Sequence, residues 1–436
     1  MSKKELKKVL DIFRPSAPTE NPKRFVGRKK QMEDIGKSLL APGRHIVVFG
    51  GRGVGKTSLI KISTKVFENA DYYKIIEYRC SHSDTISNLI YKLLSATGLL
   101  NLNEVTGYSY ETTINVGAKL PIVKGGTKTT KKTNVSIKEL VESSLTPDSI
   151  ASKFKNLKCI FIIDEFDLIE DPSVKKLVAE IIKTLSDYLS PLKLIISGVS
   201  NSAIDLLGEH RSTIRNLAEI NVPYMTNAEL LEIINTGIGE LNFGFSDELK
   251  TLITMLSCGL PYFTHLLCEE LCIYGFTKSE NTLSVEHLCK VLRDVLSKVS
   301  EVFASEYNSA TKLLGERTDF IDGWSNLNVP TEVRKLVLHS AALTLSGSMH
   351  LIAENVTNLA SASGISLPKE YTDMDDTDIA VIFDDISYYS SIVLKQNEEV
   401  MFSSPFSRSY TMLKAIEFHG LEVASCVNKE LTRCST

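Results

Sequence analysis

The stretch that most constrains the fold of this 436-residue chain is GGRGVGKTS at residues 50–58. The run before it, RHIVVF, is apolar and β-branched and is typical of a buried strand. The run after it, KTSLIKISTKVF, has apolar residues at helical spacing. Glycines in such a strand–turn–helix segment let backbone N–H groups converge on phosphate oxygens at the positive end of a helix. The sequence therefore predicts a P-loop that binds a nucleoside triphosphate.

The spacing assigns roles within this loop. Lys56 is expected to neutralise the charge of the β- and γ-phosphates, and the Thr57 hydroxyl to ligate Mg²⁺. The expected nucleotide-binding residues of the loop are Gly50, Gly51, Arg52, Gly53, Val54, Gly55, Lys56, Thr57 and Ser58.

A second motif, KCIFIIDEFDLIE, supplies the carboxylates that a hydrolysing P-loop needs. Its first half predicts a fully buried strand, with Asp164 and Glu165 at the carboxyl end, where ligands gather in open α/β sheets. We expect Asp164 to join the Mg²⁺ shell and Glu165 to polarise the attacking water. The alternative is that these acids cap the next helix, which suits Asp167 better than Asp164.

Three further strand-like runs complete the pattern: YYKIIEYRC before the Asp-Glu strand, and LKLIISGVS and AEINVPY after it. Strands that alternate with helical patterns predict an α/β fold with a five-stranded, mostly parallel sheet covered on both faces. The fourth strand leads into Asn201, which we expect to reach the γ-phosphate, with Ser200 behind it. Alternatively, this polar pair caps a helix.

Two arginines, Arg211 and Arg215, precede the fifth strand in GEHRSTIRNLAEI. One of them could be presented to the nucleotide of a neighbouring subunit, a contribution of about 10³–10⁵ in turnover where it occurs. Arg215 is the preferred candidate. Alternatively, both side chains extend from a surface helix into solvent.

These motifs, with RFVGRKKQMEDI before them and VPYMTNAELLEII after them, resemble the AAA+ ATPases of the origin-recognition branch and the related STAND signalling ATPases of prokaryotes. The resemblance covers roughly residues 15–275. It implies ATP as the nucleotide, an αβα core and a small helical lid. It also implies that Val26 and Gly27 lie beside the adenine and that a winged-helix-like domain follows the lid.

The lid segment SCGLPYFTHLLCEEL departs from one branch of that family. Gly259 and Pro261 match the family's helix start, and proline is well placed in a first helical turn. Origin-recognition-like members typically have an arginine next, which reaches the γ-phosphate, whereas this chain has Tyr262. The segment is therefore more similar to the STAND switches. His265, one turn further on, is either a phosphate contact or a core histidine.

The C-terminal region predicts helices followed by a hairpin, SIVLKQNEEVMFSSPF, as in a winged helix. In DNA readers the third helix enters the major groove between phosphates. The candidate helix here is acidic, so we expect the domain to dock on protein. Lys369 is the one basic residue among the acids Glu370, Asp373, Asp375, Asp376, Asp378, Asp384 and Asp385.

Two basic elements keep DNA as an alternative partner. Residues 1–30 hold ten Lys and Arg against three Asp and Glu. An insertion, GAKLPIVKGGTKTTKKTNVSIKEL, predicts a projecting β-hairpin around Gly125-Gly126. It could follow phosphates, contact a neighbouring subunit, or be a solvated loop. Its lysines are Lys119, Lys124, Lys128, Lys131, Lys132 and Lys138.

Composition sets the remaining limits. The chain is 43% hydrophobic and 23% charged, as in globular proteins, with no apolar run near the roughly 20 residues that span a bilayer. No signal peptide is apparent, so a cytoplasmic location without membrane contact is expected. The eight cysteines form no CxxC pair and are expected to be reduced core thiols rather than zinc ligands.

We therefore expect a basic arm at residues 1–24, an AAA+ core at 25–225 with the hairpin insertion at about 113–140, a helical lid at 226–312, and a linker with a winged-helix-like domain at 313–436. The expected function is an ATP-binding, weakly hydrolysing switch that signals to an effector or regulatory protein. A homo-oligomer and a role in antiphage defence fit this interpretation. The alternative is a DNA-binding, origin-recognition-like initiator or loader.

Overall fold

A computed structural model describes residues 1–19, 21–69, 73–97, 146–154, 156–208, 215–311, 329–344, 347–396 and 399–420. The predicted basic insertion, Arg211, Cys426 and Cys434 lie outside these residues.

Contacts divide the chain into two compact units. The sheet unit is Arg28–Pro223, and the helical unit combines Met1–Gly27 with Tyr224–Thr436. The first and last residues of the sheet unit are joined, because Arg28 Nη2 donates a hydrogen bond to Pro223 O at 2.5 Å. The chain therefore enters and leaves the sheet unit at one place. The finer predicted division of the helical unit into a lid and a winged-helix-like domain stays a prediction.

The sheet unit contains one five-stranded sheet in the order β2-β3-β4-β1-β5, and every neighbouring pair is parallel. This confirms the predicted α/β fold and the five predicted strands. The strands are β1 (His45–Gly50), β2 (Lys74–Arg79), β3 (Cys159–Asp164), β4 (Lys193–Val199) and β5 (Leu217–Asn221).

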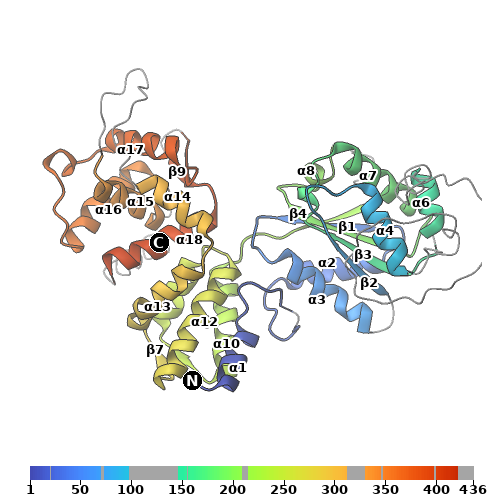
Figure 1. The fold of residues 1–436 in the computed structure, drawn as a ribbon, viewed down its shortest axis with the longest axis horizontal. Coiled ribbons are helices and arrows are strands. Elements are labelled where there is room, and N and C mark those ends of the chain that lie inside the picture. The colour runs from blue at the N-terminus through green and yellow to red at the C-terminus, as the bar shows by residue number, and fades with distance from the viewer. Residues whose placement is uncertain are drawn as a thin grey trace, which may run out of the picture. The chain divides into compact units, whose positions relative to one another are not determined.

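Helices cover both faces of this sheet, as Figure 1 shows. On one face Val47, Phe161 and Ile196 pack with α4, α6, α7 and α8 in a continuous apolar core. The alternate side chains of the same strands, such as Val48 and Ile162, are buried on the other face, where α2 and α3 contact the sheet. The elements are α2 (Lys29–Leu40), α3 (Lys56–Asn69), α4 (Ile86–Thr97), α6 (Pro147–Phe154), the 3-10 turn η2 (Phe166–Leu168), α7 (Pro172–Asp187) and α8 (Ala203–Leu207).

The helical unit is built around a single large apolar cluster. Its elements are α1 (Lys3–Ile12), α10 (Asn227–Leu241), β6 (Gly244–Phe245), α11 (Asp247–Leu256), α12 (Pro261–Lys278), β7 (Thr282–Leu283), α13 (Val285–Lys298), α14 (Glu301–Thr311), α15 (Thr331–Leu343), α16 (Met349–Ala362), the 3-10 turn η3 (Lys369–Tyr371), α17 (Asp376–Tyr389), β8 (Val393–Gln396), β9 (Glu399–Phe402) and α18 (Pro405–His419).

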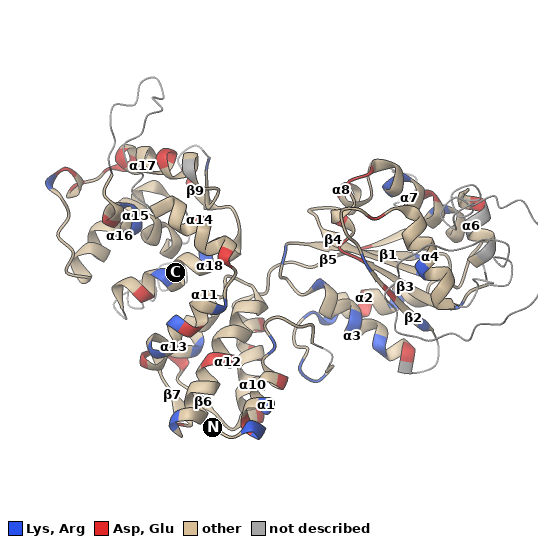
Figure 2. Cartoon of the chain, in the orientation of Figure 1, with Lys and Arg blue, Asp and Glu red and all other residues tan. Residues whose placement is uncertain are grey.

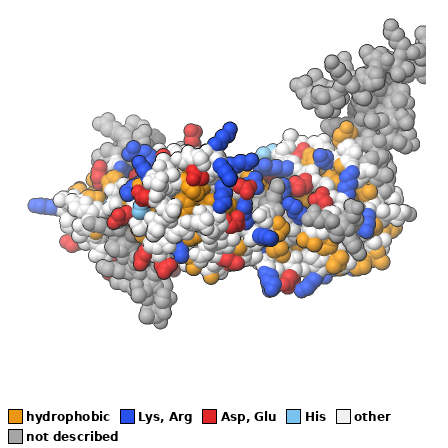
Figure 3. Space-filling model, turned by 90° about the horizontal axis from the view of Figure 1, so that it is seen from below, with side chains coloured by type: hydrophobic (Ala, Val, Ile, Leu, Met, Phe, Trp, Pro, Cys, Tyr) orange, Lys and Arg blue, Asp and Glu red, His pale blue; other side chains and the backbone are white. Residues whose placement is uncertain are grey.

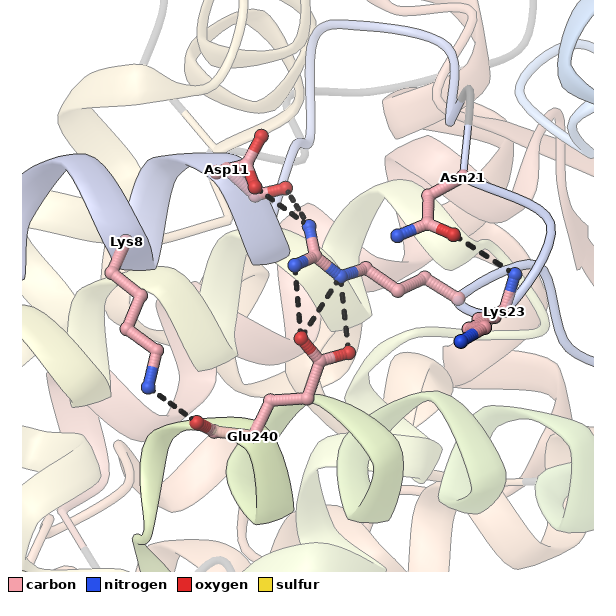
Figure 4. A network of polar contacts seen from close by, with 6 residues as sticks. Lys8, Asp11, Asn21, Lys23 and Glu240 are labelled. Carbon is pink, nitrogen blue, oxygen red and sulfur yellow. Dashed lines mark hydrogen bonds and ion pairs between the residues drawn. The ribbon is translucent and has the colours of Figure 1, made fainter.

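The segment expected to be a basic arm begins with helix α1, which packs against α10 and α12. Phe13, directly after α1, is buried against Gly237, where a Cβ atom would lie 2.3 Å from the Phe13 ring. Figure 4 shows Asp11 and Glu240 on the polar side of this contact. The Arg24 guanidinium bridges their two carboxylates, at 2.9 Å from each. An amphipathic helix with paired charges therefore replaces part of the free positive surface that the sequence suggested.

The C-terminal part runs α15, α16, α17 and then the antiparallel hairpin β8–β9, whose second strand also forms a bridge from Glu399 to Ser348. Figure 2 shows Asp and Glu residues in red along α17. Two of these acids are used internally. Asp385 is buried in an ion pair with Arg334 of α15, and Asp384 pairs with Lys395 of β8 at 2.6 Å. The exposed acidity of α17 is therefore concentrated in its first turn.

A buried chain of hydrogen bonds links four helices of this unit. Ser363 Oγ donates to Leu359 O, so it accepts from His419 Nδ1–H at 2.7 Å. His419 Nε2 then accepts from His339 Nδ1–H at 2.9 Å, and His339 Nε2 accepts from the Tyr307 hydroxyl at 2.7 Å. Each imidazole donates once and accepts once, so the chain requires both histidines to be neutral. Burial lowers the pKa of His419 to about 4 and the pKa of His339 well below its usual value.

Acid should therefore destabilise the helical unit. Between pH 6.5 and about pH 4 the unfolded chain binds protons at His339 and His419 that the folded chain does not bind, so the free energy of unfolding falls as the pH falls. The expected slope is at most about 2.7 kcal/mol per pH unit for the two groups. Urea unfolding at several pH values measures it.

Replacing both residues by asparagine should flatten that slope, whereas His350→Asn, at an exposed position, controls for the substitution itself. An unchanged slope in the double variant would contradict the assignment.

The described cysteines, Cys80, Cys159, Cys258, Cys268, Cys272 and Cys289, are all free thiols. Within the described ranges, every helix is too short or too polar to cross a membrane.

Candidate nucleotide site

The glycine-rich loop connects β1 to α3, as the sequence predicts. Gly50, Gly53 and Gly55 have φ angles of 147°, 77° and 94°, which favour glycine. Gly50 also lies so close to the chain after β5 that a Cβ atom would sit 2.3 Å from Val222 O. The loop conformation and its packing therefore both require glycine at this position.

Lys56 is the first residue of α3, and its side chain folds back over the loop. Its Nζ donates to Gly50 O at 3.1 Å and to Gly51 O at 2.8 Å. Burial lowers the pKa of Lys56, and the nearby carboxylates, Asp167 foremost, act in the opposite direction. An ammonium group is thus held at the amino end of a helix, the arrangement that binds phosphate.

Asp164, at the carboxyl end of β3, is brought to Thr57. The Thr57 hydroxyl donates to Asp164 Oδ2 at 2.8 Å, while Ser197 of β4 and the Glu165 N–H both donate to Asp164 Oδ1. A hydroxyl and a carboxylate are the oxygen ligands that Mg²⁺ takes beside nucleotide phosphates, so this pair fits the predicted metal role. Such an ion, when bound with a nucleotide, neutralises phosphate charge.

Glu165 is paired with Arg79, the last residue of β2. Arg79 Nε and Nη2 donate to the two carboxylate oxygens of Glu165 at 2.7 and 2.5 Å. The hydrogen bonds from Arg79 lower the pKa of Glu165, so the carboxylate is ionised at neutral pH. Glu165 also has a left-handed backbone with φ of 57°, an unusual conformation for a residue other than glycine.

Asn201 lies just beyond β4, the neighbour of β1 in the sheet. Ser200 forms a bridge with Gly50, so this segment runs directly beside the start of the P-loop. Asn201 itself is exposed. The cap of the following helix α8 is Ser202, which accepts from Asp205 N–H, so Asn201 does not cap that helix.

Arg215 lies elsewhere in the sheet unit. It is exposed and precedes β5, at the amino ends of the parallel strands, whereas the P-loop follows the carboxyl end of β1. Arg215 is therefore far from the nucleotide site of its own unit, and a role in a neighbouring subunit stays a prediction.

The other P-loop residues predicted to bind nucleotide differ in their exposure to solvent. Arg52 and Gly53 are exposed, Val54 is 2% exposed, and Gly51 and Ser58 are half-buried. Arg52 therefore presents its charge to solvent, while Val54 anchors the loop in the core.

Val26 and Gly27, expected beside the adenine, belong to the helical unit. Val26 packs against Met225, Leu230 and Ile233, and the left-handed Gly27, with φ of 67°, lies against Glu229. Their contact with adenine stays a prediction.

Tyr262 and His265, in the segment predicted to be a lid, have aromatic neighbours. The Tyr262 ring packs against Phe263 and Phe406, with centroids 5.1 and 5.6 Å away. His265 lies edge-on to Phe13 at 6.0 Å, and burial lowers its pKa to about 4. His265 is neutral at neutral pH, which favours the core interpretation.

Sequence reasoning missed three contributors to this site: Arg79, Ser197 and Asp167. Asp167, for which a helix cap was the alternative interpretation, accepts a hydrogen bond from Val199 N–H at 2.9 Å, and Asp171 caps α7. Arg79 could have been found, because it is a polar residue at the end of a predicted strand. Ser197 lies inside an apolar run, and no sequence pattern distinguishes it as a site residue.

Comparison with known proteins gives one family match, to the AAA domain over residues 41–207. No curated protein matches the chain.

Similar solved structures include the Walker-type ATPase PABY2304 of Pyrococcus abyssi, with 14% identity, a TM-score of 0.46, and coverage of 91% of this chain and 98% of that one. The Aeropyrum pernix ORC1 protein in complex with DNA has 15% identity, a TM-score of 0.46, and coverage of 94% and 97%. The Thermotoga maritima RuvB Holliday junction branch migration motor has 12% identity, a TM-score of 0.42, and coverage of 88% and 95%. Similarity at this level assigns no function.

The family match spans the P-loop, β3 and β4, and so includes the residues that the structure brings together around Lys56. Residues 41–207 are therefore similar to the AAA domain, and the P-loop lies within this match.

Proposed function

We propose that the protein is an ATP-binding, slowly hydrolysing switch of the AAA+/STAND-like kind. The observation that carries this proposal is the hydrogen bond between Thr57 and Asp164 beside the half-buried Lys56 ammonium. Lys56, a phosphate-binding cation, thus lies next to a metal-binding oxygen pair made by Thr57 of α3 and Asp164 at the end of β3. In this proposal Lys56 and the loop N–H groups bind the phosphates, Thr57 and Asp164 hold Mg²⁺, and Glu165 orients the attacking water.

Slow hydrolysis is supported by the pairing of Glu165 with Arg79. The two hydrogen bonds from Arg79 occupy one acceptor site on each carboxylate oxygen of Glu165 and lower its pKa, so Glu165 is a weaker base toward an attacking water. Tyr262 supports the same proposal, because it has no charge with which to neutralise a γ-phosphate and is held by aromatic neighbours.

We assign the output of the switch to the C-terminal part of the helical unit. Three helices followed by a hairpin suit a winged-helix-like domain, and the acidic first turn of α17 favours a protein partner over a phosphate backbone. The partner class is an effector or regulatory protein. Resemblance to prokaryotic STAND ATPases makes antiphage defence the leading context.

The proposal includes assembly into a homo-oligomer, in which Arg215 of one copy contacts the nucleotide of its neighbour. An exposed arginine placed away from its own P-loop is free to approach the nucleotide of a neighbouring copy.

A second candidate is a DNA-binding initiator or loader. The observation that favours it is the internal pairing of Asp384 and Asp385, which leaves α17 less acidic on its surface than its sequence suggests. Figure 3 shows Lys and Arg side chains beside Asp and Glu side chains on the face in view, so the described surface there carries both signs of charge.

Steady-state ATP turnover of the purified chain, with and without double-stranded DNA, tests these alternatives. Lys56→Ala should reduce turnover by at least about 10²-fold, because it removes the cation beside the developing phosphate charge. Slow turnover that is indifferent to DNA is the expected result.

Strong stimulation by DNA would favour the initiator. In that case, charge reversal of Lys128, Lys131 and Lys132 should abolish the stimulation. Turnover that survives Lys56→Ala would contradict the nucleotide site itself.

A further inference from the structure

Asp167 connects two loops of the candidate site that are far apart in sequence. It lies in the 3-10 turn η2, directly after Asp164 and Glu165, and its Oδ1 accepts the Val199 N–H at 2.9 Å. Val199 is the last residue of β4. The turn that follows β3 thus holds the end of the neighbouring strand.

This contact is closely packed. At Gly198 a Cβ atom would lie 2.7 Å from Asp167 Oδ1 and 3.0 Å from Asp167 N, so a residue without a side chain lets the turn approach β4. Phe166, the first residue of the turn, and Ile169, directly after the turn, are fully buried. The position of the Asp167 carboxylate is therefore determined by the core and not by a flexible side chain at the surface.

The segment held in this way reaches the P-loop. One residue beyond Val199, Ser200 forms its bridge with Gly50, and Asn201 follows. The Asp167 carboxylate also interacts electrostatically with Lys56. Burial lowers the pKa of Lys56, and among the nearby acids Asp167 raises that pKa most. One side chain thus contacts the loop that carries Asn201 and influences the cation of the P-loop.

We propose that Asp167 is a positioning residue that holds the Val199–Asn201 segment against the P-loop and thereby sets the preference for a nucleoside triphosphate over a diphosphate. The inference rests on the proposed ATP-binding function. Asp167 acts through Asn201, which depends on the position of Val199 to face the terminal phosphate.

The test measures dissociation constants of ATPγS and ADP, each with Mg²⁺, for the full chain and its variants. Asp167→Ala should lower the ATPγS-over-ADP preference by about tenfold, because the hydrogen bond that fixes the segment is lost. Asp167→Asn keeps an oxygen that can accept the Val199 N–H, so it should restore the preference.

Asp171→Ala is the matched control. It removes a carboxylate that accepts a backbone N–H in the same way, from Ser173 at 2.8 Å, but away from the loops of the site. The preference of Asp171→Ala for ATPγS over ADP should equal that of the wild type. In the Asp167→Ala/Asn201→Ala double variant the loss should be no larger than in Asn201→Ala alone, because both changes remove the same contact.

Each other outcome has a distinct meaning. An unchanged preference in Asp167→Ala, with nucleotide still bound, overturns the inference and leaves the ATP-binding proposal intact. Equal losses in Asp167→Ala and Asp167→Asn overturn it too, because charge and not the Val199 contact would then matter. A wild-type chain that binds neither nucleotide overturns the proposed function. If Asp167→Ala does not fold, Asp167→Ser, whose shorter side chain cannot reach Val199, takes its place with the same expected loss.

Discussion

Replacing Glu165 by glutamine should lower steady-state ATP turnover by about 10²–10⁴-fold, the contribution of a positioned general base. Glutamine has the same shape but cannot accept a proton at neutral pH. Because Glu165 is assigned to the attacking water and not to the phosphates, the dissociation constant for ATP should change little. Phosphate release measures the turnover, and equilibrium titration measures the affinity.

Arg79→Ala is the partner control for this prediction. The Arg79 side chain is 76% exposed, and an exposed ion pair contributes about 0–1 kcal/mol, so it can restrain Glu165 by only a few-fold. Turnover in Arg79→Ala should equal the wild-type rate or exceed it by up to about fivefold. If Glu165→Gln has wild-type turnover, Glu165 is not the base. If Arg79→Ala loses as much activity as Glu165→Gln, the ion pair is itself part of the active arrangement.

Arg334→Met should be the most destabilising single change in the helical unit. Arg334 and Asp385 are 1% and 5% exposed, and the arginine also donates to Val329 O at 3.2 Å. Removing the cation leaves a carboxylate buried without its counter-charge, at an expected cost of about 3–5 kcal/mol in the free energy of unfolding. Urea unfolding of the full chain, followed by circular dichroism, measures the loss.

A second substitution separates the charge from the packing. Arg334→Met with Asp385→Leu should recover most of the stability, because two buried charges are then replaced by apolar groups. Lys395→Met, which breaks the more exposed pair with Asp384, should cost at most about 1 kcal/mol. A loss in the double variant as large as that in Arg334→Met would assign the effect to packing.

Much of the sheet unit could be predicted from local pattern. A strand with a continuous apolar run such as CIFII is buried on both faces, which requires a layer of helices on each side of the sheet. The glycines of residues 50–55 indicate the backbone conformation of a P-loop. The structure also brings Thr57 and Asp164 together as expected, because both lie at the same edge of a parallel sheet.

The partners of these residues could not be predicted, because they depend on which strands are neighbours and in what register. Arg79 meets Glu165 only because β2 pairs with β3 so that Arg79 aligns with Asp164. Likewise, the sequence places Asp385 among the surface acids of a helix, whereas a long-range contact with Arg334 buries it. Non-local pairing of this kind leaves no periodic signal in a single sequence.

The hydrogen bond between Arg28 and Pro223 has a consequence for modular architecture. Because the chain enters and leaves the sheet unit at one place, that unit has the topology of a domain inserted into a host, between α1 and α10 of the helical unit. The host closes on itself independently, through Phe13 on Gly237 and Arg24 on Glu240. Residues 28–223 thus form a continuous segment whose two ends are adjacent. With this geometry the sheet unit can be replaced by another domain without a change in the fold of the helical unit.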